Sequence, residues 1–322
     1  MAKILVTGGC GLIGHNVVAR LERAGHEVSI IDNMTTYGIV PRDEMDYLLH
    51  ERLKHIRSVI HPVCISSERA HNIILEQKPE ILVHMASFPR QKVVNVNPQQ
   101  GARVMVEGLL NLLEASVAAG VRKFVYISSS MVYGDFTDDV REDYDCRPQG
   151  QYGIMKLMGE RLVADYARKS NMKFTVIRPS AVYGELDVED RVVSKFMLTA
   201  MRGGTLKVNG AHETLDFTYV QDAADGIVAA TLSDNTSNKT YNITKSHSTS
   251  LLTAAQLAVK IAGRGTIECR DKDADFPSRG ALNIDAARRD FGYDPQVDVE
   301  EGFQRYYNWF QNSTFWQGKL NK

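Results

Sequence analysis

A tyrosine and a lysine, Tyr152 and Lys156, lie four positions apart in a stretch whose apolar residues recur every three or four positions. On a helix this spacing places both side chains on one face. A tyrosine hydroxyl has a pKa of about 10, so a base that works near neutral pH needs its pKa lowered by about three units, or about 4 kcal/mol. A neighbouring ammonium group and a cationic nicotinamide ring both lower it. The pair therefore indicates proton transfer beside such a ring, although the same spacing also occurs on solvated helix faces.

A second group of residues has the composition of a dinucleotide site. Gly8, Gly11 and Gly14 follow a short apolar run at a spacing that suits a turn from a strand into a helix. Small residues let the backbone approach a diphosphate, whose charge is then stabilised by the N-terminus of the helix. Asp32 ends the next apolar run, where a carboxylate accepts both ribose hydroxyls of NAD and repels the additional phosphate of NADP. The alternative is a tight turn that only packs a helix on a strand. The combined context predicts NAD as the cofactor.

Both groups need a scaffold, and the first half of the chain alternates short apolar runs with longer amphipathic stretches, the pattern of a parallel sheet covered by helices. The expected strands are Ile4–Thr7, Glu27–Ile31, Ile81–His84, Lys123–Ser128 and Lys173–Ile177. The expected helices are Leu12–Ala24, Ser67–Gln77, Pro98–Ala119 and Tyr152–Lys169. We predict an α/β protein whose residues 1–178 form a Rossmann-type, doubly wound parallel sheet.

After Arg178 the rhythm changes, with a helix expected at Val192–Arg202 and short extended runs at Leu206–Val208 and Phe217–Val220. We predict a smaller, mixed α/β C-terminal substrate lobe from residues 179–216 and 247–322, with residues 217–246 returning to the NAD-binding domain. Asp222 is interpreted as the N-cap of the following helix rather than as a catalytic acid. The stretch 33–66 is interrupted by prolines and is expected to be loop with at most one helix.

The composition sets limits on partners and location. The chain has 322 residues, 43% of them hydrophobic and 24% charged, and its formal net charge is -1. This balance gives no basic excess that would attract nucleic acid. No apolar run reaches the length of a membrane helix, and the four cysteines are far apart, which suits neither a disulfide framework nor a zinc site. We expect a cytoplasmic protein without a nucleic-acid or membrane partner and without a metal.

Taken with these motifs, the chain resembles the extended short-chain dehydrogenase/reductases, the NAD-dependent epimerase/dehydratase family typified by UDP-glucose 4-epimerase. The segments that carry the resemblance are His84-Met85-Ala86-Ser87, Asn111-Leu112-Leu113-Glu114-Ala115, Arg178-Pro179-Ser180-Ala181-Val182-Tyr183-Gly184, Asp216-Phe217-Thr218-Tyr219-Val220-Gln221-Asp222 and Phe291-Gly292-Tyr293-Asp294-Pro295. The resemblance covers nearly the whole length.

The resemblance also implies a set of site residues. The catalytic residues are Ser129, Tyr152 as the base, and Lys156, which lowers the pKa of the base and binds the nicotinamide ribose. The cofactor-binding residues are Gly8, Gly11, Leu12, Ile13, Gly14, Asp32, Asn33, Met85, Ala86, Ser87, Ile127, Tyr152, Lys156 and Pro179. The substrate-binding residues are Phe88, Arg90, Ser129 and Ala181, with an ordinary loop role as the alternative for Phe88 and Arg90.

Several positions depart from the family pattern. The 4,6-dehydratases of the family carry Thr-Asp-Glu where this chain has Ser129-Ser130-Met131, so the elimination of water is not expected. Cys64 and Met105 stand where an Asp and an Asn commonly lie near the cofactor. Ala181 stands where an Asn usually contacts the sugar nucleotide, and Leu215 where an Arg usually pairs with its diphosphate. The basic residues that could replace this Arg are Arg279, His212, Lys207 and Arg191, each of which is equally typical of a surface charge.

The resemblance therefore implies a nucleotide-sugar epimerase that oxidises a sugar hydroxyl to a keto intermediate and returns the hydride. An alternative is a net dehydrogenase or reductase of a sugar nucleotide or a small hydroxy acid, and a third is a non-catalytic NAD-binding protein. The family likeness further suggests a homodimer built by the helices at Pro98–Ala119 and Tyr152–Lys169.

Overall fold

The computed structural model describes residues 1–35, 38, 40–88, 90–273 and 276–320. Within these residues the largest sheet has seven strands in the order β3-β2-β1-β4-β5-β6-β11, and all neighbours are parallel. The strands are β1 (Lys3–Thr7), β2 (Glu27–Ile31), β3 (Val59–His61), β4 (Ile81–His84), β5 (Lys123–Ile127), β6 (Lys173–Pro179) and β11 (Lys239–Ile243). The prediction of a doubly wound α/β fold is confirmed.

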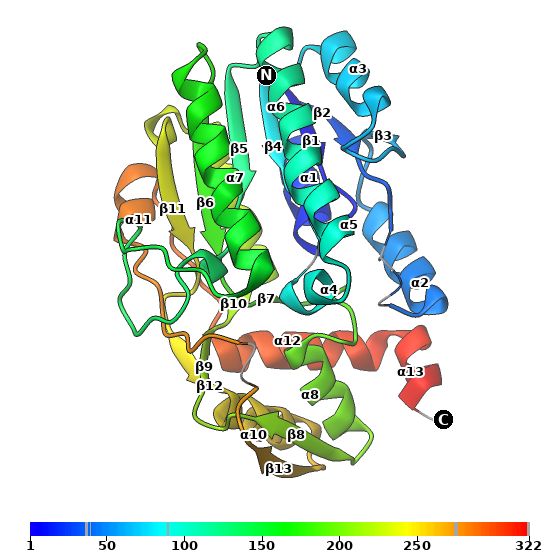
Figure 1. Cartoon of the computed structure of the whole chain (residues 1–322). Coiled ribbons are helices and arrows are strands. Elements are labelled where there is room, and N and C mark those ends of the chain that lie inside the picture. The colour runs from blue at the N-terminus through cyan, green and yellow to red at the C-terminus, as the bar shows by residue number, and fades with distance from the viewer. Residues whose placement is uncertain (36–37, 39, 89, 274–275, 321–322) are drawn as a thin grey trace.

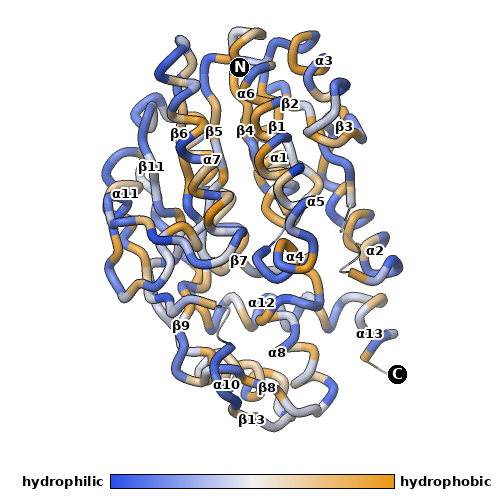
Figure 2. Tube along the Cα trace, viewed as in Figure 1, coloured by the Kyte–Doolittle hydropathy of each residue, from blue (hydrophilic) through white to orange (hydrophobic). Residues whose placement is uncertain are grey.

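Helices cover both faces of this sheet (Figure 1). One face packs on α3 (Glu68–Gln77), α4 (Gln91–Val96), α5 (Pro98–Ala102), α6 (Gly108–Ala119) and α7 (Gly150–Arg168). The other packs on α1 (Leu12–Arg23), α2 (Arg42–Leu53), α9 (Val220–Leu232) and α11 (Asp285–Phe291). Because both faces are covered, neighbouring strand residues such as Leu82 and Val83 are both fully buried, in different clusters. Figure 2 shows hydrophobic residues concentrated along these central strands and on the helices beside them.

A smaller lobe lies beyond one end of the sheet, at the bottom of Figure 1. Its strands pair as β8 (Thr205–Asn209) with β13 (Thr266–Arg270), β9 (Thr214–Asp216) with β12 (Ser248–Ser250), and β7 (Val182–Tyr183) with β10 (Thr218–Tyr219). Its helices are α8 (Val192–Met201), α10 (Leu251–Ala262), α12 (Val299–Asn312) and α13 (Thr314–Leu320). A separate apolar cluster, which includes Met197, Phe303 and Trp316, forms the core of this lobe.

Three local expectations differ from the structure. The stretch 33–66 contains a strand, β3, as well as the helix α2; β3 has only three residues at the sheet edge, and α2 has few apolar residues, so neither gives a strong pattern. The expected helix Pro98–Ala119 is interrupted by a wider π-helical turn at Arg103–Glu107. Asp222 is not an N-cap. It lies in the first turn of α9 and accepts a hydrogen bond from the backbone of Val297 at 2.8 Å.

No helix in the described part of the chain combines the length and the apolar character needed to cross a bilayer.

Candidate active site

A cleft of about 1610 Å³ lies at the carboxyl ends of the central strands, between the sheet and the smaller lobe. This is the place where ligands of open parallel sheets bind. Every site residue expected from the sequence lines this cleft. On the cofactor side these are Gly8, Gly11, Leu12, Ile13, Gly14, Asp32, Asn33, Met85, Ala86, Ser87, Ile127, Tyr152, Lys156 and Pro179, and on the substrate side Phe88, Arg90, Ser129 and Ala181. The structure therefore brings together residues that are up to 173 positions apart, from Gly8 to Ala181.

The glycine-rich turn joins β1 to α1 and is tightly packed. Gly8 has a φ of +75°, and a Cβ there would lie 2.6 Å from the backbone nitrogen of Ala86. A Cβ on Gly14 would lie 2.1 Å from the carbonyl oxygen of Gly8. No side chain caps the N-terminus of α1, whose N-cap is Gly11. The first backbone N–H groups of α1 therefore face the cleft without a capping side chain, an arrangement that binds a diphosphate.

Asp32 follows β2 at the edge of the same turn. Its Oδ2 accepts a hydrogen bond from the backbone nitrogen of Cys10 at 2.9 Å, and its Oδ1 accepts one from Met34 at 2.7 Å. Each carboxylate oxygen has a further lone pair for a hydroxyl group. The carboxylate is thus held rigidly at the position where it can accept the two ribose hydroxyls of a dinucleotide.

Arg52 is a cleft residue that the sequence reasoning missed. It comes from α2, is 4% exposed, and donates hydrogen bonds to the carbonyl oxygens of Leu186 at 2.6 Å and Cys10 at 3.4 Å. Burial lowers its pKa, and the charges of Asp187 and Asp32 oppose that shift. Arg52 therefore connects the glycine-rich turn to the segment 185–191 of the smaller lobe. No motif signals this role, because it depends on a contact between residues 134 positions apart.

Tyr152 and Lys156 share the face of α7 that points into the cleft. The Lys156 ammonium donates a hydrogen bond to the carbonyl oxygen of Ile127 at 2.8 Å and lies 5.8 Å from the centroid of the Tyr152 ring. Burial lowers the pKa of Lys156 to about 7, opposed by the charge of Glu160. Burial raises the pKa of Tyr152, opposed by the charge of Arg191 and by a hydrogen bond with Ser129. Ser129 is thus a direct hydrogen-bond partner of the candidate base.

A buried network fixes the segment that carries Ser129. Arg178, at the end of β6, forms an ion pair with Glu160 of α7 in which Nη2 and Oε2 are 2.7 Å apart. Glu160 also accepts a hydrogen bond from Ser128 at 2.5 Å, and Arg178 donates one to the hydroxyl of Tyr133 at 2.8 Å. Both ends of the serine-containing segment are therefore tied to the same ion pair.

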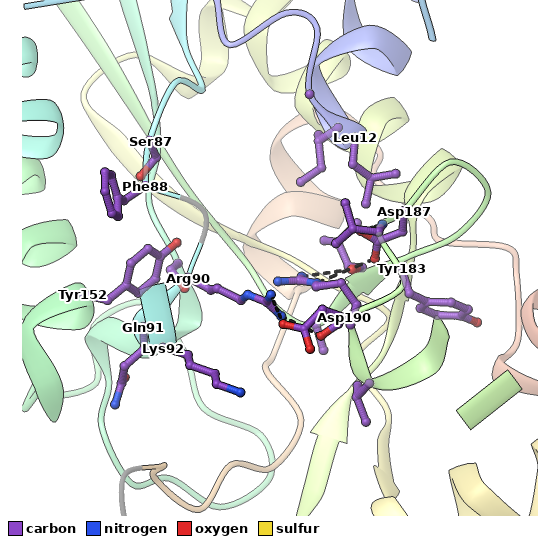
Figure 3. Close-up of a pocket in the computed structure, with 18 of the residues that line it drawn as sticks. Leu12, Ser87, Phe88, Arg90, Gln91, Lys92, Tyr152, Tyr183, Asp187 and Asp190 are labelled. Carbon is purple, nitrogen blue, oxygen red and sulfur yellow. Dashed lines mark hydrogen bonds and ion pairs between the residues drawn. The ribbon is translucent and has the colours of Figure 1, made fainter. Parts of the chain in front are cut away.

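The substrate side of the cleft is crossed by an ion pair. Arg90, from the segment after β4, contacts the carboxylate of Asp190 and donates a hydrogen bond to its carbonyl oxygen at 2.7 Å. Figure 3 shows Arg90 reaching from the side of Tyr152 to Asp190. Lys195 of α8 pairs with the same carboxylate. Ala181, which lines the same cleft, has a φ of +35°. This backbone conformation favours the Asn that the family usually has here over the alanine of this chain.

The structure shows which of the departures from the family pattern, and which of the basic residues that could compensate for them, reach the cleft. Cys64, Leu215, Lys207, Arg191 and Arg279 line it. Met105, in the π-helical turn before α6, is buried in the apolar core, and its neighbour Val104 lines the cleft instead. His212 is not among the lining residues. In the described part of the chain no cluster of His, Cys, Asp and Glu could hold a metal ion.

Comparison with known proteins gives consistent matches. A model of the NAD dependent epimerase/dehydratase family matches residues 4–244. The uncharacterized UDP-glucose epimerase YtcB of Bacillus subtilis is 27% identical over 93% of this chain and 95% of its own length. UDP-glucuronic acid decarboxylase 1 of Arabidopsis thaliana is 28% identical over 96% of this chain and 70% of its own length. The crystal structure of UDP-glucuronic acid 4-epimerase from Bacillus cereus, in complex with UDP-glucuronic acid and NAD, superposes with a TM-score of 0.88 at 26% identity, covering 95% of this chain and 98% of that one.

Proposed function

The chain belongs to the NAD dependent epimerase/dehydratase family, and from this we propose that it is an NAD-dependent nucleotide-sugar epimerase similar to UDP-glucose 4-epimerase. The observation that carries the proposal is the placement of Ser129, Tyr152 and Lys156 in one cleft with the glycine-rich turn and Asp32. A base, its ammonium neighbour and a dinucleotide site are the components that reversible oxidation of an alcohol requires.

The residues present suit NAD. The N-terminus of α1 has no capping side chain, and a Cβ at either Gly8 or Gly14 would fill space that the turn occupies. These features leave backbone N–H groups for the diphosphate, while Asp32 offers a negative charge to the ribose hydroxyls. That charge disfavours a ribose carrying a phosphate, which supports NAD over NADP.

In the proposed reaction Tyr152 takes the proton of the sugar hydroxyl at its phenolic oxygen. The ammonium of Lys156 favours the phenolate form, and Ser129 binds the same hydroxyl group while the proton moves. Bound NAD would supply the acceptor for the hydride of the hydroxyl-bearing carbon and, in its reduced form, the donor for its return. Tyr152 then gives its proton back to the oxygen of the keto sugar. If the hydride returns to the opposite face of the keto sugar, the configuration of one carbon is inverted without net oxidation.

Met131 supports epimerisation over dehydration. It is 6% exposed, lines the cleft, and stands where the dehydratases of the family carry a carboxylic acid. A thioether neither donates nor accepts the proton that the elimination of water requires. The keto sugar is therefore expected to survive until the hydride returns.

The test is incubation of the purified protein, loaded with NAD, with UDP-glucose or UDP-glucuronic acid. Proton NMR follows the sugar, and absorbance follows NADH. We expect a stereoisomer to accumulate without net NADH. NADH that accumulates in proportion to an oxidised product would instead identify a dehydrogenase, and release of carbon dioxide from UDP-glucuronic acid would identify a decarboxylase such as the Arabidopsis relative.

The same proposal divides the chain between two ligands. Residues 1–178 and 217–246 form the NAD-binding domain in this proposal, and residues 179–216 and 247–322 form the substrate-binding lobe. We also propose a homodimer formed by α6 and α7, because Val117, Ile154 and Met158 are 40%, 51% and 39% exposed on these adjoining helices. Light scattering of an Ile154→Glu variant tests this, with a monomer as the expected result.

A cytoplasmic location is supported by four free thiols.

A further inference from the structure

Two arginines face the same part of the cleft in the smaller lobe. Arg279 lines the cleft, its Nε has no hydrogen-bond partner, and no described carboxylate lies within ion-pair distance of its guanidinium. Burial and the charge of Arg191 together lower the pKa of Arg279 to about 10, opposed by the charge of Glu213. A partly buried cation beside a like charge is unfavourable unless an anion neutralises it.

Two described carboxylates lie near these arginines, and neither forms a hydrogen-bonded ion pair with them. Glu213 is the carboxylate whose charge favours the ionised form of Arg279, but it pairs with Lys272 at 3.1 Å. The Nε of Arg191 lies 3.6 Å from Oδ2 of Asp187, a distance that allows attraction but no hydrogen bond. This carboxylate oxygen has no hydrogen-bond partner. The guanidinium groups of Arg191 and Arg279 therefore both have donors left for a ligand.

The position of Arg279 is fixed beside the residue where the family arginine is missing. The hydroxyl of Thr214, on β9, donates a hydrogen bond to the carbonyl oxygen of Arg279 at 2.5 Å. Leu215 is the next residue of that strand and also lines the cleft. Arg279 thus enters from a different segment of the chain at the level of Leu215, which offers no charge of its own.

Arg191 connects this place to the reaction centre, because its charge lowers the pKa of Tyr152 as well as that of Arg279. Lys207 and Asn209 of β8 and Arg270 of β13 also line this cleft. Arg191 thus lies between Tyr152 and Arg279 in this series of electrostatic contacts, as a diphosphate follows the sugar in a sugar nucleotide.

We propose that Arg279 and Arg191 together bind the diphosphate of the sugar nucleotide and replace the single arginine that the family commonly has at the position of Leu215. The inference rests on the proposed function, since it takes the ligand to be a sugar nucleotide. Two guanidinium groups neutralise the two charges of a diphosphate diester, and their planar donors match its oxygens in pairs.

Calorimetric titration with UDP and with uridine tests the proposal, because these ligands differ only in the diphosphate. Arg279→Met and Arg191→Met are each expected to reduce the preference for UDP over uridine roughly ten- to hundredfold while leaving the affinities for uridine and NAD unchanged. Arg264→Met, an exposed arginine outside the cleft, is the control and keeps the wild-type preference.

A second substitution makes the test specific to position. Adding Leu215→Arg to the Arg279→Met variant is expected to restore the preference for UDP, since the new guanidinium enters at the same level. If both methionine variants keep the wild-type ratio of UDP to uridine affinity, the proposed diphosphate site is contradicted, even when the enzyme epimerises sugar nucleotides. A wild-type protein that binds NAD but converts no sugar nucleotide would instead contradict the proposed function.

Discussion

Lys156 holds its ammonium nitrogen 5.8 Å from the centroid of the Tyr152 ring, one turn away on α7. The carbonyl oxygen of Ile127 fixes this nitrogen through a 2.8 Å hydrogen bond. Burial lowers the pKa of Lys156 to about 7 and raises the pKa of Tyr152, so the free protein does not favour an ammonium and phenolate pair. A cationic nicotinamide ring beside the tyrosine would favour its phenolate form, because the opposite charge lowers the pKa of the hydroxyl. The base is therefore expected to become active only when the cofactor is bound.

Tyr152→Phe is predicted to retain NAD and to lose activity by about 10² to 10⁴, because the ring still fills its place while the proton acceptor is gone. Thermal shift with NAD and the NMR assay of sugar epimerisation measure the two properties. Tyr166→Phe, on the same helix but at its exposed end, should leave both unchanged. Substantial turnover by Tyr152→Phe would remove the assignment of the base.

Glu160→Gln is predicted to lower the free energy of unfolding by about 3–5 kcal/mol, because it leaves the guanidinium of Arg178 buried without its counter-charge. The two side chains are only 7% and 6% exposed. The exposed pair Glu301 and Arg305, with side chains 50% and 47% exposed, is the control, and Glu301→Gln should change stability by about 1 kcal/mol or less. Equal effects in urea denaturation would show that burial does not determine the contribution of the pair.

Asp32→Asn is predicted to reduce the preference for NAD over NADP by about tenfold, since the amide removes the charge that repels a ribose phosphate. The amide oxygen can still accept one of the two backbone hydrogen bonds that the carboxylate now accepts from Cys10 and Met34. Affinities of the variant for both cofactors, measured by fluorescence titration, provide the comparison. Unchanged selectivity would mean that another residue recognises the ribose.

The sequence predicted the parts of the site that depend on local patterns. The buried strands are nearly continuous apolar runs, and the glycine-rich turn, Asp32 and the Tyr152 pair follow them at short distances along the chain. Arg52 was not predicted, and Arg279 was only one of four basic candidates, because their places depend on contacts with Leu186 and Thr214, 134 and 65 positions away. A basic residue that reaches a cleft has no local signal that separates it from one on the surface.

His84 links the stability of the protein to pH. It ends β4, is 3% exposed, and its Nδ1 lies 2.7 Å from the hydroxyl oxygen of Thr7 on β1. Burial lowers its pKa to about 3, whereas the unfolded chain binds the proton at the ordinary pKa of about 6.5. Between these two values the unfolded state binds more protons than the native state, so the stability contributed by the neutral side chain is lost as the pH falls.

The predicted contribution of His84 between pH 6.5 and pH 5 is about 2 kcal/mol, from about 1.5 pH units at about 1.4 kcal/mol each. His84→Asn keeps a polar partner for Thr7 but does not titrate, so its free energy of unfolding should fall by about 2 kcal/mol less than that of the wild type over this range. Urea denaturation at pH 6.5 and pH 5 gives both differences, with His55→Asn, at an exposed position just after α2, as the control. The comparison uses the change with pH, so any loss of packing in the variant cancels. Identical pH dependence in wild type and His84→Asn would show that the native protein accommodates a protonated His84.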